Sequence, residues 1–413
     1  MKKIFKNYKM SIMLLGGVIL GAIIGLIFKE QAAILSPLGD LYLNLLLITI
    51  VPLIFLTITT SFGNAKSPKR LGKIIGSVIL VFIVTSLVAL LIGFVSTYFV
   101  KLVDIKDTSS IVDTLNLDTT EDSNVELNLL ERTVSAISTN DFVNLLSKDN
   151  IIVLVIVSLL VGVSIMMAKE KAIPFYSFLD SAKEVLLKFI NITTYYAPIG
   201  LGCYMASLVG TLGGEIAKGY LFTFIYYLII SILFFVVVYS IYAYIAAGKK
   251  GVVKFWKNII PAAVTALATC SSAASIPANI ESAKKIGVSS DIADTTISLG
   301  TSFHKDGSII GSVFKIMFLV CLFGTNINTL NSIGTILLVA LISTLLVTAV
   351  PVGGGTISET LIIVLMGYSL GALPVLTIIA TIIDAPATVL NVVGDTSSSM
   401  LVSRIVDGKK WLK

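Results

Sequence analysis

The chain has 413 residues, of which 56% are hydrophobic and only 13% are charged, and its mean hydropathy is +0.97. This composition excludes an ordinary soluble protein and predicts an all-helical polytopic membrane protein. The net charge of +6 is explained by basic loops beside anionic lipid headgroups, and it does not indicate a nucleic-acid partner.

Six apolar runs predict membrane-crossing helices in the first part of the chain. Such a helix needs about 20 mostly apolar residues to cross a hydrocarbon layer of about 30 Å. The runs lie at 11–28, 38–63, 74–100, 151–168, 186–210 and 219–247.

The distribution of charge predicts the orientation of these helices. Lys and Arg cluster at both termini and at 64–73, 168–172 and 248–257, which the positive-inside rule places in the cytoplasm. The segment 103–149 is acidic and rich in Ser, Thr and Asn, so we expect an extracellular loop there. Both termini are then cytoplasmic, and the number of crossings is even.

From residue 254 onward the apolar runs become shorter. Segment 254–286 has two short arms around TCSSAAS, and segment 330–366 has two arms around VPVGGGT, although its first arm is long enough to span. Each segment is followed by an apolar stretch with a polar interruption. The interruption is HKDGS after the first segment and DAPATVLNVVGD after the second. The charge pattern makes the two segments enter from opposite sides. Such inverted repeats are typical of secondary transporters, whose binding sites lie near the bilayer midplane.

Polar residues in the second half indicate candidate binding groups. Asp384, Thr388, Asn391 and Asp395 are spaced by four, three and four residues and share one helix face. They form either a functional site, because carboxylates inside a membrane usually mark solute or ion pathways, or a polar seam between helices. The Ser pair at 271–272 either receives a carboxylate at a helix start or caps that helix. The glycines at 353–355 either bring backbone close to a ligand or form a turn.

Four motifs in order resemble the dicarboxylate/amino acid:cation symporter family, the glutamate and neutral amino acid transporters with an elevator mechanism. They are SSAAS at 271–275, HKDGS at 304–308, VGGGT at 352–356 and DxxxTxxNxxGD at 384–395, with YAPIG at 196–200 in addition. The resemblance covers nearly the whole chain. It implies a homotrimer in the inner membrane of a prokaryote, with eight transmembrane helices and two re-entrant helical hairpins in each protomer.

The resemblance also implies a division into a scaffold and a moving transport domain. Scaffold helices 1–2 would occupy 1–70, and scaffold helices 4–5 would occupy 150–213. The transport domain would comprise helix 3 at 71–102 and the segment 214–413, which holds helix 6, hairpin 1, helix 7, hairpin 2 and helix 8. The loop 103–149 would be extracellular.

The site residues follow from matching positions in the family. Asp384 would bind a substrate ammonium group and Asp395 a sodium ion. The substrate-binding positions are Ser271, Ser272, Val352, Gly353, Gly354, Asp384, Ala387, Thr388 and Asn391. The sodium-binding positions are Thr85, Ser86, Gly300, His304, Asp306, Asn391 and Asp395. Sodium would be a coupling ion, and no cofactor is expected.

Departures from the family pattern bear on the substrate. Family members that carry acidic amino acids have an Arg at the position of Ala387 or just before the Ser-rich tip, where this chain has Cys270. Without either guanidinium group, a second substrate carboxylate would be buried without a partner. We therefore predict import of a small neutral amino acid such as serine, threonine or alanine. The alternative is another small solute such as a dicarboxylate, with Lys305 replacing one sodium ion.

Other departures bear on the coupling ion. His304 and Lys305 replace the usual Asn-Met pair, and Phe82 replaces a Tyr that supplies a hydroxyl. We expect Lys305 to act as a tethered cation that pairs with Asp306, Asp395 or Glu359, with the loss of at least one sodium site. Coupling would then depend on a proton at Lys305 or His304. In the alternative interpretation Lys305 forms a structural ion pair near an aqueous cavity.

Other functional classes fit the sequence less well. An intramembrane aspartyl protease would carry GxGD, but here Val392 replaces the first glycine. A channel does not need two different hairpin tips. Cys203, Cys270 and Cys321 lie in apolar stretches without metal-like spacing and predict no disulfide framework. We expect a transporter that is not an enzyme, with membrane lipids and a small solute as its partners.

Overall fold

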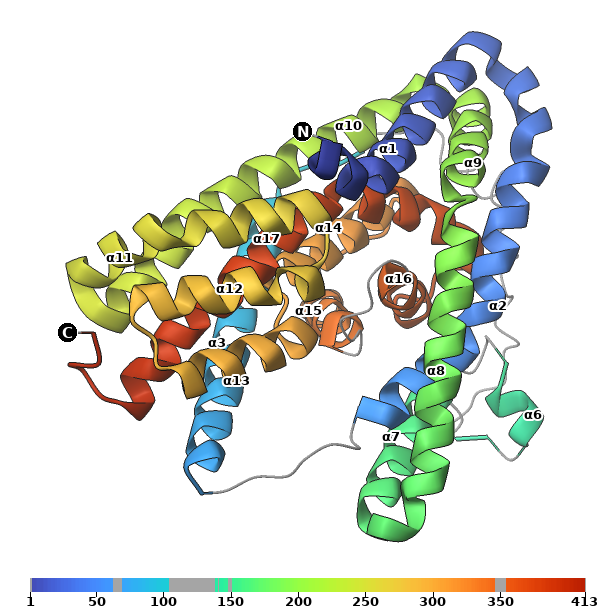
Figure 1. The fold of residues 1–413 in the computed structure, drawn as a ribbon. Coiled ribbons are helices and arrows are strands. Elements are labelled where there is room, and N and C mark those ends of the chain that lie inside the picture. The colour runs from blue at the N-terminus through green and yellow to red at the C-terminus, as the bar shows by residue number, and fades with distance from the viewer. Residues whose placement is uncertain are drawn as a thin grey trace.

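A computed structural model describes residues 2–61, 69–103, 138–139, 141–147, 151–345 and 354–412. All regular secondary structure in these residues is helical (Figure 1), so the predicted all-helical class is confirmed for the described part. Most of the expected loop 103–149 and the tip residues Val352 and Gly353 lie outside the described residues.

The described residues of the first half of the chain lie mostly in long apolar helices. Their bounds are α1 Lys2–Phe28, η1 Lys29–Leu35, α2 Ser36–Ser61, α3 Lys69–Tyr98, α6 Phe142–Leu145, α7 Ile151–Ala168, η3 Lys169–Ala172, α8 Ile173–Thr194 and α9 Ala197–Leu212. The run expected to form one helix over 186–210 is divided, because α8 ends at Thr194 and α9 begins at Ala197. Pro198 lies in the first turn of α9, where proline is tolerated because no helical hydrogen bond requires its N–H.

The second half alternates long and short helices. Their bounds are α10 Gly214–Leu233, η4 Phe234–Val238, α11 Tyr239–Thr269, α12 Ser272–Ile286, α13 Ser290–Phe303, α14 Asp306–Phe323, α15 Leu330–Leu345, α16 Gly354–Leu365, η5 Leu370–Ala372 and α17 Leu373–Val406. The two polar interruptions behave differently. The backbone leaves the helix at His304 and Lys305, between α13 and α14, whereas α17 continues through 384–395.

The expected first hairpin is visible as a turn between α11 and α12. Cys270 adopts a left-handed conformation at the end of α11, and Ser271 caps α12. The two helices pack against each other. For the second expected hairpin, α15 and α16 also pack together.

Five stretches in the described residues are long and apolar enough to cross a membrane. They are Gly16–Tyr42, Lys73–Tyr98, Gly214–Leu267, Ser290–Phe323 and Leu370–Val406. Shorter apolar helices also occur, at Ile156–Ile165, Ala197–Thr211 and Leu330–Leu345. The division into eight crossing helices and two re-entrant hairpins stays a prediction.

The helices form two packed groups (Figure 1). In one group α1 packs on α9, and α2 packs on α7, α8 and α9. In the other, α17 packs on α3, α10, α11, α12, α13 and α14. The helix α16 lies between the groups, since it contacts α14, α15 and α17 on one side and α2 and α7 on the other.

Candidate functional site

The break between α13 and α14 places the chain's only histidine inside the second helix group. The His304 N–H donates to the Gly300 carbonyl at 2.9 Å and ends α13. His304 is extended, Lys305 is also outside the helical conformation, and α14 then begins at Asp306. The side chains of His304 and Asp306 are 0% exposed and that of Asp395 is 1% exposed. The break therefore places a polar side chain between carboxylates where water is excluded.

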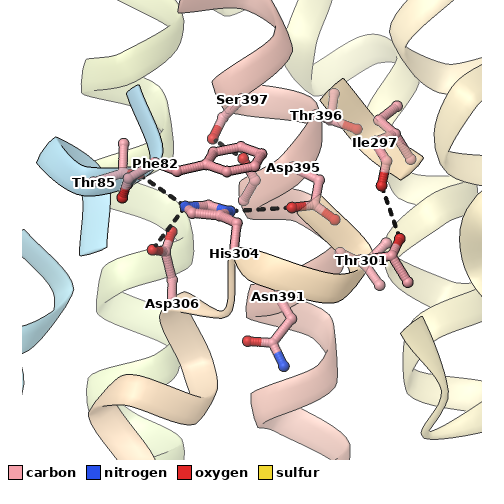
Figure 2. A network of polar contacts seen from close by, with 12 residues as sticks. Phe82, Thr85, Ile297, Thr301, His304, Asp306, Asn391, Asp395, Thr396 and Ser397 are labelled. Atoms are coloured by element: carbon pink, nitrogen blue, oxygen red, sulfur yellow. Dashed lines mark hydrogen bonds and ion pairs between the residues drawn. The ribbon is translucent and has the colours of Figure 1, made fainter. Parts of the chain in front are cut away.

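Both ring nitrogens of His304 face oxygen atoms (Figure 2). Nδ1 lies 3.0 Å from Oδ1 of Asp395, and Nε2 lies 2.8 Å from Oγ1 of Thr85. The Thr85 hydroxyl lies 2.8 Å from the Val81 carbonyl and donates to it, so it accepts from Nε2–H. When Asp395 is ionised its carboxylate only accepts, so Nδ1 then donates as well, and a ring that donates from both nitrogens carries a positive charge.

Asp306 is the second carboxylate beside the His304 ring, and it interacts with the ring more through its charge than through a directed hydrogen bond. Its Oδ1 lies 3.1 Å from Nε2 of His304, yet this buried oxygen receives no hydrogen bond from the described residues. The Tyr239 hydroxyl lies 3.2 Å from Asp306 Oδ2 and 2.6 Å from the Leu390 carbonyl, so its single proton is shared between two acceptors. The π-helical turn η4 directly precedes Tyr239. We call Thr85, His304, Asp306 and Asp395 the histidine centre.

The walls of the histidine centre leave little free space. The Phe82 ring stacks on the imidazole, with centroids 4.5 Å apart and planes inclined by 16°. A methyl group at Gly300 would lie 2.1 Å from Oδ1 of Asp395, and one at Gly394 would lie 2.9 Å from Oδ2 of Asp306. Glycine at these two positions lets the backbone of α13 and α17 approach the carboxylates closely.

Asn391 and Asn279 join α17 to its neighbours beside the centre. The Asn391 amide accepts from the Ser308 N–H at 3.2 Å and donates to the Ser308 hydroxyl at 3.0 Å. It thereby satisfies a backbone donor in the first turn of α14. Asn279 of α12 donates to the Val392 carbonyl at 2.8 Å and accepts a short hydrogen bond from Thr396.

The other end of the polar face of α17 carries Asp384. Its carboxylate is exposed and accepts a hydrogen bond from Thr388. The ammonium groups of Lys305 and Lys315 and the carboxylate of Glu359 are within electrostatic reach of it. Ala387, one turn away, is buried where the backbone at Gly307 packs against it. This part of the protein therefore combines two carboxylates, those of Asp384 and Glu359, with two ammonium groups.

The carboxylates that Lys305 was expected to pair with also face other side chains. His304, and not Lys305, lies between Asp306 and Asp395. Glu359 pairs with Lys315, whose Nζ is 3.5 Å from Oε1. Lys305 is half-buried and interacts electrostatically with Asp395 and Asp384.

The remaining candidate residues lie at helix ends or in the interior. Ser271 accepts from the Ala274 N–H at 3.2 Å and is a helix cap, while Ser272 begins α12. Ser86 is buried next to Thr85, and Gly354 begins α16.

The comparisons with known proteins support this arrangement. The profile of the sodium:dicarboxylate symporter family matches residues 10–405. The chain belongs to this family. The resemblance inferred from the four motifs is thus confirmed, and so is the expectation of a transporter in place of an enzyme.

Relatives of the symporter carry related names. A C4-dicarboxylate transport protein of Rhizobium leguminosarum bv. trifolii (strain WSM2304) is 27% identical over 347 residues, which cover 83% of this chain and 76% of the relative. A protein of the same name from Bacillus subtilis (strain 168) is 25% identical over 403 residues, covering 97% and 94%. A proton/sodium-glutamate symport protein of Bacillus caldotenax is 24% identical over 409 residues, covering 94% and 92%.

Two residues near the site were missed by the sequence reasoning. Lys315 is a charged residue in the apolar run of α14, and that rarity alone is a usable signal. Tyr239 is one of 14 tyrosines, and nothing in its local sequence separates it from the others.

Proposed function

We propose that this symporter carries C4-dicarboxylates across a prokaryotic inner membrane together with a cation. The names of the relatives that match 83% and 97% of the chain carry the proposal. The geometry supports it, because the ammonium group of Lys305 lies within electrostatic reach of Asp384, whereas Lys315 is already paired with Glu359. A dianionic solute that leaves water needs positively charged partners. Lys305 would bind one substrate carboxylate, in place of the arginine that is absent at Ala387 and Cys270.

A small neutral amino acid is the second candidate. The exposed carboxylate of Asp384 would bind an ammonium group, and no guanidinium group is available at positions 270 and 387. The names of the relatives support the dicarboxylate better than this first expectation from the sequence.

Counterflow in proteoliposomes separates the two candidates without an ion gradient. Vesicles loaded with unlabelled succinate should accumulate labelled succinate, and malate and fumarate should compete while serine and alanine should not. Asp384→Asn should retain succinate exchange, because it removes a negative charge near a dianion. If the solute is an amino acid, the same change removes the partner of its ammonium group and costs about 2–5 kcal/mol of binding, which is roughly 30-fold or more.

Asp294→Asn is a matched control. Asp294 lies on α13 with its side chain 52% exposed and is paired with Lys284, so we expect no change in exchange for either substrate. Accumulation of labelled serine that succinate fails to inhibit, together with its loss in Asp384→Asn, would contradict the dicarboxylate proposal.

The proposal includes the elevator movement, the homotrimer and the cytoplasmic termini implied by the family pattern. The helices α1, α2 and α7–α9 pack mainly on one another, and so do α3 and α10–α17, although α1 and α9 also contact helices of the second group. This packing supports a scaffold and a moving domain with the expected boundaries. Cysteine pairs placed on α16 and α2, which are in contact, would test it. Cross-linking should block exchange if the two groups slide past each other.

A further inference from the structure

The histidine centre contains oxygen atoms suited to a cation, and the imidazole ring of His304 already lies among them. Thr85, Asp306 and Asp395 supply a hydroxyl and two carboxylates, and such oxygen ligands suit hard cations. In this chain, however, both nitrogens of His304 lie within 3.1 Å of those oxygens. We propose that the imidazole of His304 permanently occupies a coupling-ion position, so that this centre takes no sodium ion. This inference rests on the proposed cation-coupled transport and assigns the role of one of its ion sites.

Space is the first argument against a sodium ion in this centre. A hard cation of similar size contacts oxygen ligands at about 2.3–2.6 Å, so its ligands must converge on one point. Here the ring lies between Asp306 and Asp395, with Phe82 stacked on it and its Cε1 atom close to Gly394. Sodium could bind both carboxylates only if the ring left this position.

Charge is the second argument. Two carboxylates buried away from water require a positive partner. Both nitrogens of the His304 ring face these carboxylates, and the Lys305 ammonium lies within electrostatic reach of Asp395. An imported sodium ion dissociates in every transport cycle and transmits its gradient, whereas a tethered ring stays. The centre is therefore stabilised without using the sodium gradient.

The test compares sodium-specific stabilisation of four purified proteins in lipid nanodiscs. The thermal unfolding midpoint is measured in sodium chloride and in choline chloride of equal ionic strength, because a ligand that binds only the folded state raises the midpoint. The proteins are the wild type, Thr85→Val, His304→Asn and the double variant. His304→Asn removes the ring and leaves an amide oxygen beside two carboxylates.

We expect Thr85→Val to leave the sodium response of the wild type unchanged. In contrast, His304→Asn should gain a sodium-specific rise of several degrees, which the double variant should lose. Sodium bound elsewhere in the protein would raise all four midpoints equally and leaves this comparison intact.

Two results would overturn the proposal. One is a sodium response of the wild type that Thr85→Val abolishes, since sodium would then bind in the presence of the ring. The other is a folded His304→Asn protein without any gain, since the ring would then not be what excludes the ion. Because the measurement needs no solute, it stands apart from the counterflow assay, whose failure would count against the proposed substrate alone.

Discussion

At the scale of single residues, the geometry of the histidine centre requires glycine at certain neighbouring positions as much as it requires the charged groups. A methyl group at Gly300 would lie 2.1 Å from Oδ1 of Asp395, the oxygen that accepts from His304. The Asp395 side chain would have to move away from the ring. We expect Gly300→Ala to lower the free energy of unfolding by about 1–3 kcal/mol, the usual cost of overpacking, and to abolish solute exchange.

Gly334→Ala is the control for this change. Gly334 lies inside α15 with no atom within 4 Å of an added methyl group, so alanine there should be neutral or stabilise by up to about 1 kcal/mol. The two variants are compared by thermal unfolding and counterflow. Equal behaviour would show that the close approach of α13 to Asp395 is not required.

The residues of the centre could be predicted from the sequence only in part. Asp306 and Asp395 are prominent because carboxylates are rare in membrane helices, and both lie in the centre. Which of His304 and Lys305 joins them could not be predicted, because it depends on the φ and ψ angles of two residues outside any helix. Phe82 looked like a loss of a hydroxyl, but in the structure its ring stacks on His304.

At the scale of helices, a buried ion pair connects α16 to α14. Lys315 and Glu359 are 8% and 1% exposed, and Thr377 of α17 donates to the second Glu359 oxygen at 3.3 Å. Lys315→Met leaves a buried carboxylate without its cation, so we expect a loss of about 3–5 kcal/mol. The double variant Lys315→Met/Glu359→Gln should recover most of this loss, as measured by a double-mutant cycle of thermal unfolding.

A surface pair on α12 provides the comparison. Lys285 and Glu281 are 58% and 66% exposed, so Lys285→Met should change stability little, because water screens such pairs. If Lys315→Met were equally harmless, the pair would not hold α16 in place.

The helices themselves could be predicted better than their breaks. The lengths of the apolar runs predicted α2, α3 and α7, because a long apolar stretch in lipid has to satisfy its own backbone hydrogen bonds and therefore forms a helix. The division between α8 and α9 was missed because hydropathy is continuous across 186–210, although Pro198 marks the turn. The spacing of four, three and four residues at 384–395 predicted one helix face there, and α17 is continuous through these residues.

At the scale of the whole molecule, close contact between α1 and α9 holds the first helix group together. Gly17, Gly21 and Gly25 are spaced by four residues on α1, and added methyl groups there would lie 2.0–2.5 Å from backbone carbonyl oxygens of α9. Small residues at this spacing let helices pack closely in membranes, where the hydrophobic effect does not drive association. The pattern was visible in the sequence, but its partner helix was not.

A methyl group added to α1 should therefore lower the stability of the protein where it meets α9, and leave the solute affinity of the second helix group unchanged. Gly21→Ala would place that group 2.0 Å from the Gly202 carbonyl and separate α1 from α9, so we expect a lower unfolding midpoint. Gly16→Ala, five residues earlier with no atom within 4 Å of the added methyl group, should keep the wild-type midpoint. The histidine centre lies in the other group, so solute affinity measured at equilibrium below the midpoint should be equal in both variants. A change in that affinity in Gly21→Ala would show that the site depends on how α1 and α9 pack, and that the two groups do not behave as separate bodies.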